Sequence, residues 1–260
     1  LKKIVLSNRP SVNYSKLVLN FGSQTIIPNE FESLVKNRNA FTIKPFLRAY
    51  DLIQKEDIFD SVNELPFVIV GSGLAAIEVS YALRKRWRGR SLKLLCDSRK
   101  INNTILKSLR NSNIDLVQNL NFDYGKILLC TGNTSPLWVQ KKFLDSDSHG
   151  RIITNQNLQL KSLSGIFAAG DCAVVDSAKR PASGVFAVKV VNTLVKNLKK
   201  DIEGGSLRKW LPQRIGLQII NIFPSHHQKA FAIYRKFVFG PSFLFWTVSY
   251  THLTLPTMYT

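Results

Sequence analysis

Short apolar runs separated by turn-forming residues recur along the first half of the chain. Each run is rich in Leu, Ile and Val and is about as long as a typical strand. Uninterrupted runs of this kind are expected in a parallel sheet, where both faces of a strand are buried. The runs that we predict as strands are Lys3–Leu6, Lys16–Phe21, Phe67–Val70, Ser91–Cys96, Ile114–Gln118 and Lys126–Cys130.

Stretches with the spacing of amphipathic helices lie between these runs and beyond them. The alternation of strand and helix predicts an α/β protein. The helices that we predict are a short one within residues 28–39, Phe46–Ile53, a helix that begins near Leu74, Thr104–Arg110 and Val185–Leu198. The apolar positions expected on one face are Ala75, Val79, Ala82 and Leu83 in the helix after Leu74, and Val185, Val188, Val191, Val195 and Leu198 in the last helix.

The C-terminal part of the chain is predicted to be a small α/β piece. Two strands rich in aromatic residues are expected there, Gly216–Phe223 and Lys229–Phe239. Packing of these rings in a core is the favoured interpretation, and contact with a membrane surface is the alternative. The last residues, Ser249–Thr260, carry no Lys, Arg, Asp or Glu and are rich in threonine, and we interpret them as a doubtful, non-native tail.

A glycine turn joins the strand Phe67–Val70 to the helix that follows it. In a dinucleotide-binding fingerprint, the first glycine permits the turn and the second lets the backbone approach a pyrophosphate, while a third small residue lets the helix pack closely. Gly71, Gly73 and Ala76 occupy these positions. The helix N-terminus carries about half a positive charge, which favours a diphosphate. The stretch therefore predicts a nucleotide site.

An acidic residue follows the next predicted strand. Asp97 lies 21 positions after Ala76, close to the spacing of about 20 at which a carboxylate receives the ribose hydroxyls of NAD. Arg99 and Lys100 come directly afterwards, and either of them is suited to the 2′-phosphate of NADP, so the choice between the two nucleotides stays open. A turn residue that begins the next loop is the equally weighted alternative for Asp97.

Two other strands end in a small residue and a glycine. Gly22-Ser23 follows Lys16–Phe21, and Thr131-Gly132 follows Lys126–Cys130. Ligands of α/β sheets bind at the carboxyl ends of strands, although each pair taken alone is an ordinary turn. Because the two pairs flank the nucleotide unit, we interpret them as the crossings between two interleaved domains.

A further buried strand ends at Gly170 and is followed at once by Asp171. A carboxylate in this position is suited to accept hydrogen bonds from a polyol such as a ribityl chain, and an Asx turn is the alternative. Ser183 is a suitable N-cap for the helix Val185–Leu198. A helix that begins beside Asp171 would direct its positive end toward the same cleft. An ordinary capped packing helix is the alternative.

Composition narrows the possible classes of protein. The chain has 36 basic and 17 acidic residues, a net charge of +19. Such a charge suits nucleic acid or an anionic membrane, but the basic residues are spread along the chain, so we favour a solvated surface that attracts anionic cofactors.

Cys96, Cys130 and Cys172 are far apart, which excludes a C-x-x-C dithiol and indicates a reducing, cytoplasmic compartment.

Two local features argue against a metal site and a membrane span. His226 and His227 have no nearby Cys or His at ligand spacing, and we predict that they are solvated and bind no metal. The longest apolar run, Phe237–Val248, is interrupted by Gly240-Pro241 and is too short to cross a bilayer. We therefore predict a cytoplasmic protein, with peripheral membrane contact as the alternative.

Four segments together resemble a known family. LVLNFGSQT, VIVGSGLAAIE, ILLCTGN and GIFAAGDCA occur in the order found in the pyridine nucleotide-disulphide oxidoreductases. Within that family, the segments TIKPFLRAYDLI, RPASGVFAVKVVNTLVKNL and LRKWLPQRIGLQIIN resemble the type II NADH dehydrogenase-like FAD proteins found alone or fused ahead of selenide, water dikinase. The resemblance implies two interleaved Rossmann-like domains. FAD would be bound by residues 1–60 and 135–200, NAD(P)H by the inserted residues 61–134, and residues 201–260 would form the C-terminal piece.

The resemblance also implies roles for individual residues. Hydride would pass from NAD(P)H to FAD and then to a small-molecule or quinone-like acceptor, with Glu78 near the reacting rings as the catalytic candidate. Gly71, Gly73, Ala76 and Asp97 would bind NAD(P)H. The residues implied to bind FAD are Gly22, Ser23, Thr131, Gly132, Gly170, Asp171, Gly184 and Val185.

Several departures from the family pattern leave alternatives open. The family opens with a βαβ fingerprint for the adenosine diphosphate of FAD, which nothing before Leu17 supplies, so we expect either a chain truncated upstream or loss of FAD binding. The link from Gln118 to Lys126 is too short for the usual β-meander. Ala182 replaces a lysine, and Lys189 and Val190 stand where related enzymes have glutamine near a quinone, which argues against a quinone acceptor. A non-catalytic nucleotide-binding relative is the alternative function, and a nucleic-acid or membrane binder ranks last.

Overall fold

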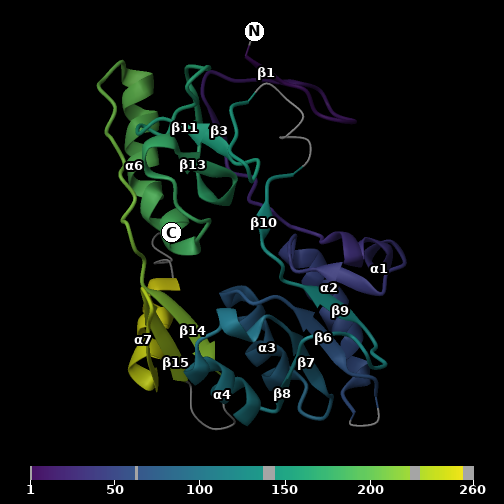
Figure 1. Cartoon of the computed structure of the whole chain (residues 1–260). Helices are drawn as coiled ribbons and strands as arrows, with labels where there is room; N and C mark the ends of the chain where they lie inside the picture. The colour runs from purple at the N-terminus through teal and green to yellow at the C-terminus, as the bar shows by residue number, and fades with distance from the viewer. Residues whose placement is uncertain (1, 62–63, 137–143, 223–228, 254–260) are drawn as a thin grey trace, which may run out of the picture. The chain divides into compact units, whose positions relative to one another are not determined.

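Four of the predicted strands pair in one parallel sheet of the computed structural model, which describes residues 2–61, 64–136, 144–222 and 229–253. The sheet is five-stranded and β6 lies at its centre, fully buried (Figure 1). The fifth strand, β5, was not predicted, because its three residues are too few to show a pattern. The strand order is β5 (Ala40–Thr42), β9 (Ile127–Leu129), β6 (Phe67–Val70), β7 (Leu92–Leu95) and β8 (Ile114–Val117).

Three helices connect successive strands of this sheet: α2 (Phe46–Lys55), α3 (Leu74–Arg86) and α4 (Asn103–Asn111). A further short helix, α1 (Glu32–Lys36), precedes β5. The predicted apolar face of α3 is wrong at two positions, because Ala75 and Ala82 are exposed. The buried residues are Ala76, Ile77, Ser80, Tyr81 and Leu83. The helix turns this face inward because Ala76 packs against the glycine turn, and a strand from the C-terminal part also packs against α3.

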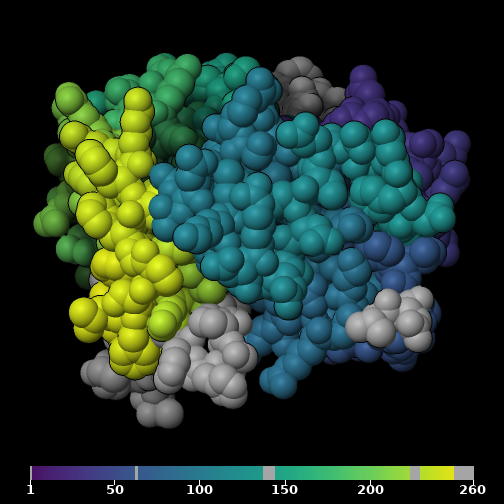
Figure 2. All heavy atoms as spheres, turned by 60° about the horizontal axis from the view of Figure 1, so that its bottom comes forward, coloured from purple at the N-terminus to yellow at the C-terminus, as the bar shows by residue number. Residues whose placement is uncertain are grey.

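That C-terminal part is an antiparallel sheet with a helix packed on it. Its strands are β14 (Gln218–Ile222), β15 (Lys229–Tyr234) and β16 (Phe237–Ser242), followed by α7 (Phe243–Leu253). Residues 229–239 were predicted as a single strand, which is wrong, since Arg235 has a φ of 57° and the chain reverses there. Ile220 and Phe231 join the hydrophobic core beneath α3, and Figure 2 shows the yellow C-terminal residues directly beside the blue residues of the parallel-sheet region.

The remaining strands are short. Two parallel pairs are β3 (Leu17–Leu19) with β12 (Ile166–Ala168), and β11 (Ile152–Thr154) with β13 (Ala173–Val175). An antiparallel pair is formed by β1 (Lys3–Ile4) and β2 (Val12–Asn13). The strands β4 (Gln24–Thr25) and β10 (Asn133–Thr134) have two residues each. The long helix α6 spans Gly184–Glu203.

The predicted apolar face of α6 is wrong at three of its five positions, whereas Val185 and Leu198 are partly buried. Val188, Val191 and Val195 are exposed, and the buried residues are Val190, Leu194 and Asn197. A polar residue decides the orientation: the amide nitrogen of Asn197 donates to the carbonyls of Asn157 and Arg208, and its amide oxygen accepts from the backbone N–H of Arg208 at 2.8 Å. With this side of α6 turned inward, the Asn197 amide is buried and all three of these hydrogen bonds are made. A buried amide without partners would cost free energy, so its hydrogen bonds decide the orientation of the helix over the spacing of the valines.

The chain divides into two compact units. The first unit is Leu1–Gln24 with Asn133–Gly216, and the second is Thr25–Gly132 with Leu217–Thr260. These limits differ from the expected domain boundaries near 60 and 200, because β5 pairs with β9 and the C-terminal sheet packs on α3. Among the described residues, no helix combines the length and the apolar character needed to cross a membrane.

Candidate cofactor sites

The turn between β6 and α3 requires glycine at its first position. Gly71 has a φ of +145°, and a Cβ atom there would lie 2.5 Å from the carbonyl oxygen of Cys130 and 3.2 Å from the Cβ of Ala76. Gly73, the N-cap of α3, has an ordinary φ of −89°, and a Cβ there would meet open space. Gly71 and Ala76 thus let the strand and the helix pack closely, whereas Gly73 leaves open space in front of the helix N-terminus.

A pocket of about 890 Å³ opens at the carboxyl ends of β6, β7 and β8. This volume lies within the usual range for sites that bind small molecules and cofactors. Gly71, Ser72, Asp97 and Arg99 are among the residues that line it. The backbone N–H of Asp97 donates to the Ser72 hydroxyl at 2.9 Å, so the glycine turn and the end of β7 are joined directly at the wall of the pocket.

Both interpretations of Asp97 have a structural basis. Its carboxylate caps the short helix Ser98–Lys100 by accepting from the Arg99 backbone N–H, as a turn residue does. The Arg99 side chain also donates to both carboxylate oxygens, at 2.9 and 3.1 Å, and these bonds lower the pKa of Asp97. Because Asp97 also lines the pocket, a ribose hydroxyl would have to compete with the exposed Arg99 guanidinium for this carboxylate.

Glu78 lies on α3 and is half-buried. Burial raises the pKa of its carboxyl group, although the backbone N–H of Asn221 in β14 donates to it and opposes that effect. Glu78 therefore keeps its proton to a higher pH than an exposed glutamate does.

Thr131 and Gly132 make backbone connections within the second unit. The Thr131 hydroxyl donates to the carbonyl of Ile26, and the N–H of Ile26 donates to the Gly132 carbonyl at 3.1 Å. Gly132 has a φ of +106°, which favours glycine. In this structure the two residues act as a turn that holds two chain segments together.

In the first unit, the ends of two paired strands bring Ser23 and Asp171 together. Leu19 of β3 lies opposite Ala168 of β12, so the residues after each strand share one edge. The Ser23 hydroxyl donates to Asp171 at 3.3 Å. Gly170 has a φ of +76°, a backbone conformation that favours glycine beside the carboxylate.

Ser23 and Asp171 line a pocket of about 430 Å³, and four of the residues in its wall are basic. Sequence reasoning missed this wall, which comes from residues far apart along the chain. Asp147 accepts from the Arg151 guanidinium at 2.7 and 2.9 Å, and the remaining Arg151 nitrogen donates to the Arg180 carbonyl at 2.5 Å. These bonds fix the segment that leads into α6. The basic residues of the wall are His149, Arg151, Lys179 and Arg180.

Gly184 and Val185 begin α6, as the pattern predicts to within one residue. Ser183 occupies the N-cap position, but its side chain makes no capping hydrogen bond. Its backbone carbonyl accepts from the N–H groups of Phe186 and Ala187 instead. A Cβ at Gly184 would meet open space, and Gly22, with a φ of +72°, has the same property.

The candidate residues fall into two sets, one in each compact unit. Gly22, Ser23, Gly170, Asp171, Gly184 and Val185 belong to the first unit, and Gly71, Gly73, Ala76, Glu78, Asp97, Thr131 and Gly132 belong to the second. Glu78 lies in the second turn of α3, where Asn221 of β14 contacts it, and it does not line the pocket beside Gly71. The other residues of each set lie at the carboxyl ends of strands or at the start of the helix that follows.

Neither a metal centre nor a dithiol is found among the described residues. No group of three or more His, Cys, Asp or Glu side chains there is arranged to hold a metal ion, and His226 and His227 lie outside the described residues. Cys96, Cys130 and Cys172 are free and buried, and burial raises the pKa of Cys130 to about 12. Such thiols are poor nucleophiles near neutral pH.

Two curated proteins are similar to the chain over most of its length. A probable NADH dehydrogenase from Dictyostelium discoideum is 28% identical and covers 71% of this chain, and ferroptosis suppressor protein 1 from Taeniopygia guttata is 23% identical and covers 79%. The chain is distantly related to the pyridine nucleotide-disulphide oxidoreductases. It spans only 53% and 64% of the lengths of these two relatives. Neither is named for selenide, water dikinase, so that part of the resemblance has no support.

The fold agrees with this relationship. A solved NAD-dependent persulfide reductase from A. fulgidus superposes with a TM-score of 0.62 at 16% identity, covering 86% of this chain and 44% of that protein. The predicted α/β, Rossmann-like architecture is therefore confirmed. No model of a known protein family matches the chain.

Proposed function

We propose that the chain belongs to an FAD-dependent oxidoreductase that accepts hydride from NAD(P)H and passes electrons to an acceptor. The observation that carries this proposal is the glycine turn after β6, which stands at the edge of a pocket of about 890 Å³. The distant relationship to a probable NADH dehydrogenase supports the same reaction class.

The residues of the second unit fit a nicotinamide nucleotide. Gly71 lets the chain turn between strand and helix, and the open space at Gly73 would admit a pyrophosphate to the N-terminus of α3. Asp97 would accept from the ribose hydroxyls, or Arg99 would receive a 2′-phosphate. Glu78 would hold a proton at its carboxyl group over a wider pH range than an exposed glutamate.

The residues of the first unit fit the ribityl and ring half of FAD. Asp171, held by Ser23, would accept from the ribityl hydroxyls, and the open backbone at Gly184 would offer N–H groups at the start of α6. The adenosine diphosphate half needs a second strand, glycine turn and α-helix in direct succession. Within the described residues only the unit at Gly71 has that form.

Bound nicotinamide and flavin would supply the hydride donor and acceptor, and the protein would supply binding and orientation. In this proposal Gly71 and Asp171 hold one cofactor each. The positive ends of α3 and α6 would favour anionic groups near them, because unpaired N–H groups are concentrated at helix N-termini. The electron acceptor is proposed only as a small, oxidising molecule.

A titration with two variants tests the proposal. The chain is titrated with NADH and NADPH, and separately with riboflavin and FAD, with ligand fluorescence as the readout. Asp97→Asn is expected to weaken nicotinamide nucleotide binding and to leave flavin binding unchanged, and Asp171→Asn is expected to do the reverse. Failure of the parent chain to bind either nicotinamide nucleotide, or equal effects of both variants on both ligands, would contradict the proposal.

A non-catalytic nucleotide-binding protein is the second candidate. It is favoured by the single strand–glycine–helix unit within the described residues and by the short link between β8 and β9. This function predicts NADH binding without reduction of bound flavin or of an added dye such as ferricyanide. Anaerobic bleaching of bound flavin by NADH distinguishes the two functions.

A further inference from the structure

Two cations follow Asp97 after the end of β7, and the structure gives them different positions. Arg99 lines the pocket of about 890 Å³ beside Gly71, as Asp97 does, whereas Lys100 does not line it. The side chain of Arg99 is 88% exposed, so few contacts hold it in one place. Of the two cations, Arg99 is therefore the one that a nucleotide in this pocket would meet.

Arg99 already occupies most of the Asp97 carboxylate. Oxygen Oδ1 accepts from the Arg99 backbone N–H at 3.2 Å and from Nε at 2.9 Å, and Oδ2 accepts from Nη2 at 3.1 Å. A carboxylate offers about four positions to hydrogen-bond donors. Arg99 takes three of them, one with its backbone and two with its side chain. The two hydroxyl groups of an NADH ribose would therefore have to compete with the Arg99 side chain.

The 2′-phosphate of NADPH would meet the same ion pair differently. A guanidinium group can donate to two phosphate oxygens at once, and the bonds to Asp97 use Nε and Nη2, which leaves Nη1 for this purpose. The guanidinium would also separate the phosphate from the negative charge of Asp97. Exposed ion pairs contribute little to stability, so NADH can open this one at a modest cost, which NADPH avoids.

We propose that Arg99 makes this site select NADPH over NADH. The inference rests on the proposed function and deepens it by naming the nucleotide. When NADPH binds, the Arg99 guanidinium stays beside Asp97 and donates to the 2′-phosphate. When NADH binds, the guanidinium has to leave Asp97 before the ribose hydroxyls can donate to that carboxylate. Arg99 is thus a specificity-determining residue that acts in opposite directions on the two nucleotides.

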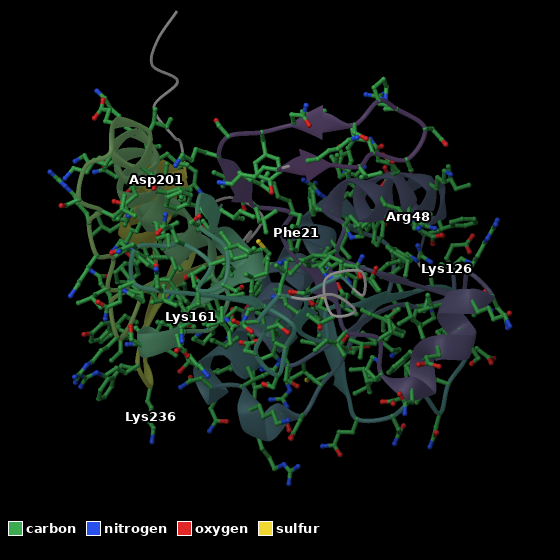
Figure 3. All side chains as sticks on the ribbon, turned by 90° about the horizontal axis from the view of Figure 1, so that it is seen from above. Phe21, Arg48, Lys126, Lys161, Asp201 and Lys236 are labelled. Carbon is green, nitrogen blue, oxygen red and sulfur yellow. The ribbon has the colours of Figure 1, made fainter. Side chains whose placement is uncertain are left out.

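Titration of the whole chain with NADH and with NADPH, followed by ligand fluorescence, tests this proposal. We expect the parent chain to bind NADPH about tenfold more tightly than NADH. Arg99→Ala should weaken NADPH binding about tenfold or more and tighten NADH binding about threefold, because the carboxylate of Asp97 is released. The matched control is Arg48→Ala, which removes an exposed arginine of α2 that does not line the pocket (Figure 3). It should leave both affinities unchanged.

A double-mutant cycle separates the two effects of Arg99. In an Asp97→Asn background, Arg99→Ala should no longer tighten NADH binding, because the carboxylate for which Arg99 competes is gone. The loss of NADPH affinity should persist in that background, since the guanidinium donates to the phosphate itself. Lys100→Ala should change either affinity by less than about threefold, because an exposed cation that does not line the pocket acts only at longer range.

Other outcomes would overturn the proposal. Tighter binding of NADH than of NADPH by the parent chain would assign the site to NADH. Equal weakening of both nucleotides by Arg99→Ala would show that Arg99 acts through net charge alone. Unchanged NADH affinity in that variant would show that the ribose uses another acceptor, such as Glu30, which also lines the pocket.

These failures differ from a failure of the proposed function. A parent chain that binds both nucleotides, with a ratio that Arg99→Ala does not alter, contradicts only the role of Arg99. A parent chain that binds neither nucleotide contradicts the proposed function itself. Thermal unfolding followed by circular dichroism establishes that each variant is folded, and no flavin is needed in any of these measurements.

Discussion

Replacing Gly71 by alanine tests the central claim that this turn brings strand and helix together. The new Cβ would lie 2.5 Å from the carbonyl oxygen of Cys130, 3.0 Å from its carbon and 3.2 Å from the Cβ of Ala76. The first two atoms belong to the backbone that follows β9 and pairs with β6, so they cannot rotate away as a flexible side chain would. The φ of +145° adds strain, because residues with a Cβ rarely adopt it.

The magnitude follows from these two effects. A backbone held in a region that only glycine populates costs about 1–3 kcal/mol, and overpacking of a buried site costs a similar amount, so we expect a loss of about 2–6 kcal/mol. Whole domains are stable by about 5–15 kcal/mol. Gly71→Ala should therefore remove a large part of the stability of the second unit.

Gly73→Ala is the matched control two residues away. Its φ of −89° suits alanine and its Cβ would meet open space. Alanine is a poorer N-cap than glycine but loses less chain entropy on folding, so the net change in stability should stay within about 1 kcal/mol. If the proposed nucleotide site is correct, the added methyl group nevertheless weakens NADH binding about tenfold or more, which corresponds to about 1.4 kcal/mol.

Urea unfolding, followed by circular dichroism, measures both variants against the parent chain, and NADH titration measures binding. Gly71→Ala as stable as the parent would refute the argument from the Cys130 contact. If Gly73→Ala unfolds as readily as Gly71→Ala, the division between a packing glycine and a binding glycine is wrong. A stable Gly73→Ala that binds NADH normally would leave the packing argument intact and contradict the nucleotide site.

Two further predictions concern buried charged groups. Because the pKa of Glu78 is raised on folding, the folded chain binds more protons than the unfolded one, and its stability falls as pH rises above the unfolded pKa. Glu78→Gln should therefore be more stable than the parent chain toward neutral pH, and the difference should vanish at acid pH. Urea unfolding at several pH values measures this, and a stability difference that is the same at every pH would contradict the prediction. Arg90 is 3% exposed, donates to Glu56 at 3.0 Å and lies over the rings of Phe67 and Trp87. Arg90→Met should lower the free energy of unfolding by about 3–5 kcal/mol, since it leaves the buried carboxylate of Glu56 unpaired. Glu56→Gln keeps a hydrogen-bond acceptor for Arg90 and should cost less. A loss below about 1 kcal/mol for Arg90→Met would show that the Glu56 carboxylate is hydrated instead.

Local features of the chain could be read from the sequence. The turn Gly71–Gly73 with β6 before it and α3 after it is continuous in the chain, and its requirements are steric ones that neighbouring residues impose. The positions of β7, β8, β9 and β12 were predicted to within one or two residues, because a short apolar run in an α/β protein is usually a buried strand. The likeness to flavoprotein oxidoreductases followed from the same segments.

Tertiary structure decided which faces and which distant residues meet. The inward faces of α3 and α6 depend on Ala76 and Asn197 finding partners elsewhere, which outweighs the periodicity of exposed alanines and valines. The Asp147–Arg151–Arg180 contacts join residues that no local pattern connects. The hairpin at Arg235 leaves Phe237 outside although its sequence resembles that of a core strand. Hydrophobicity determines that a residue tends to be buried, but only the packing of the whole chain determines whether space in a core is left for it.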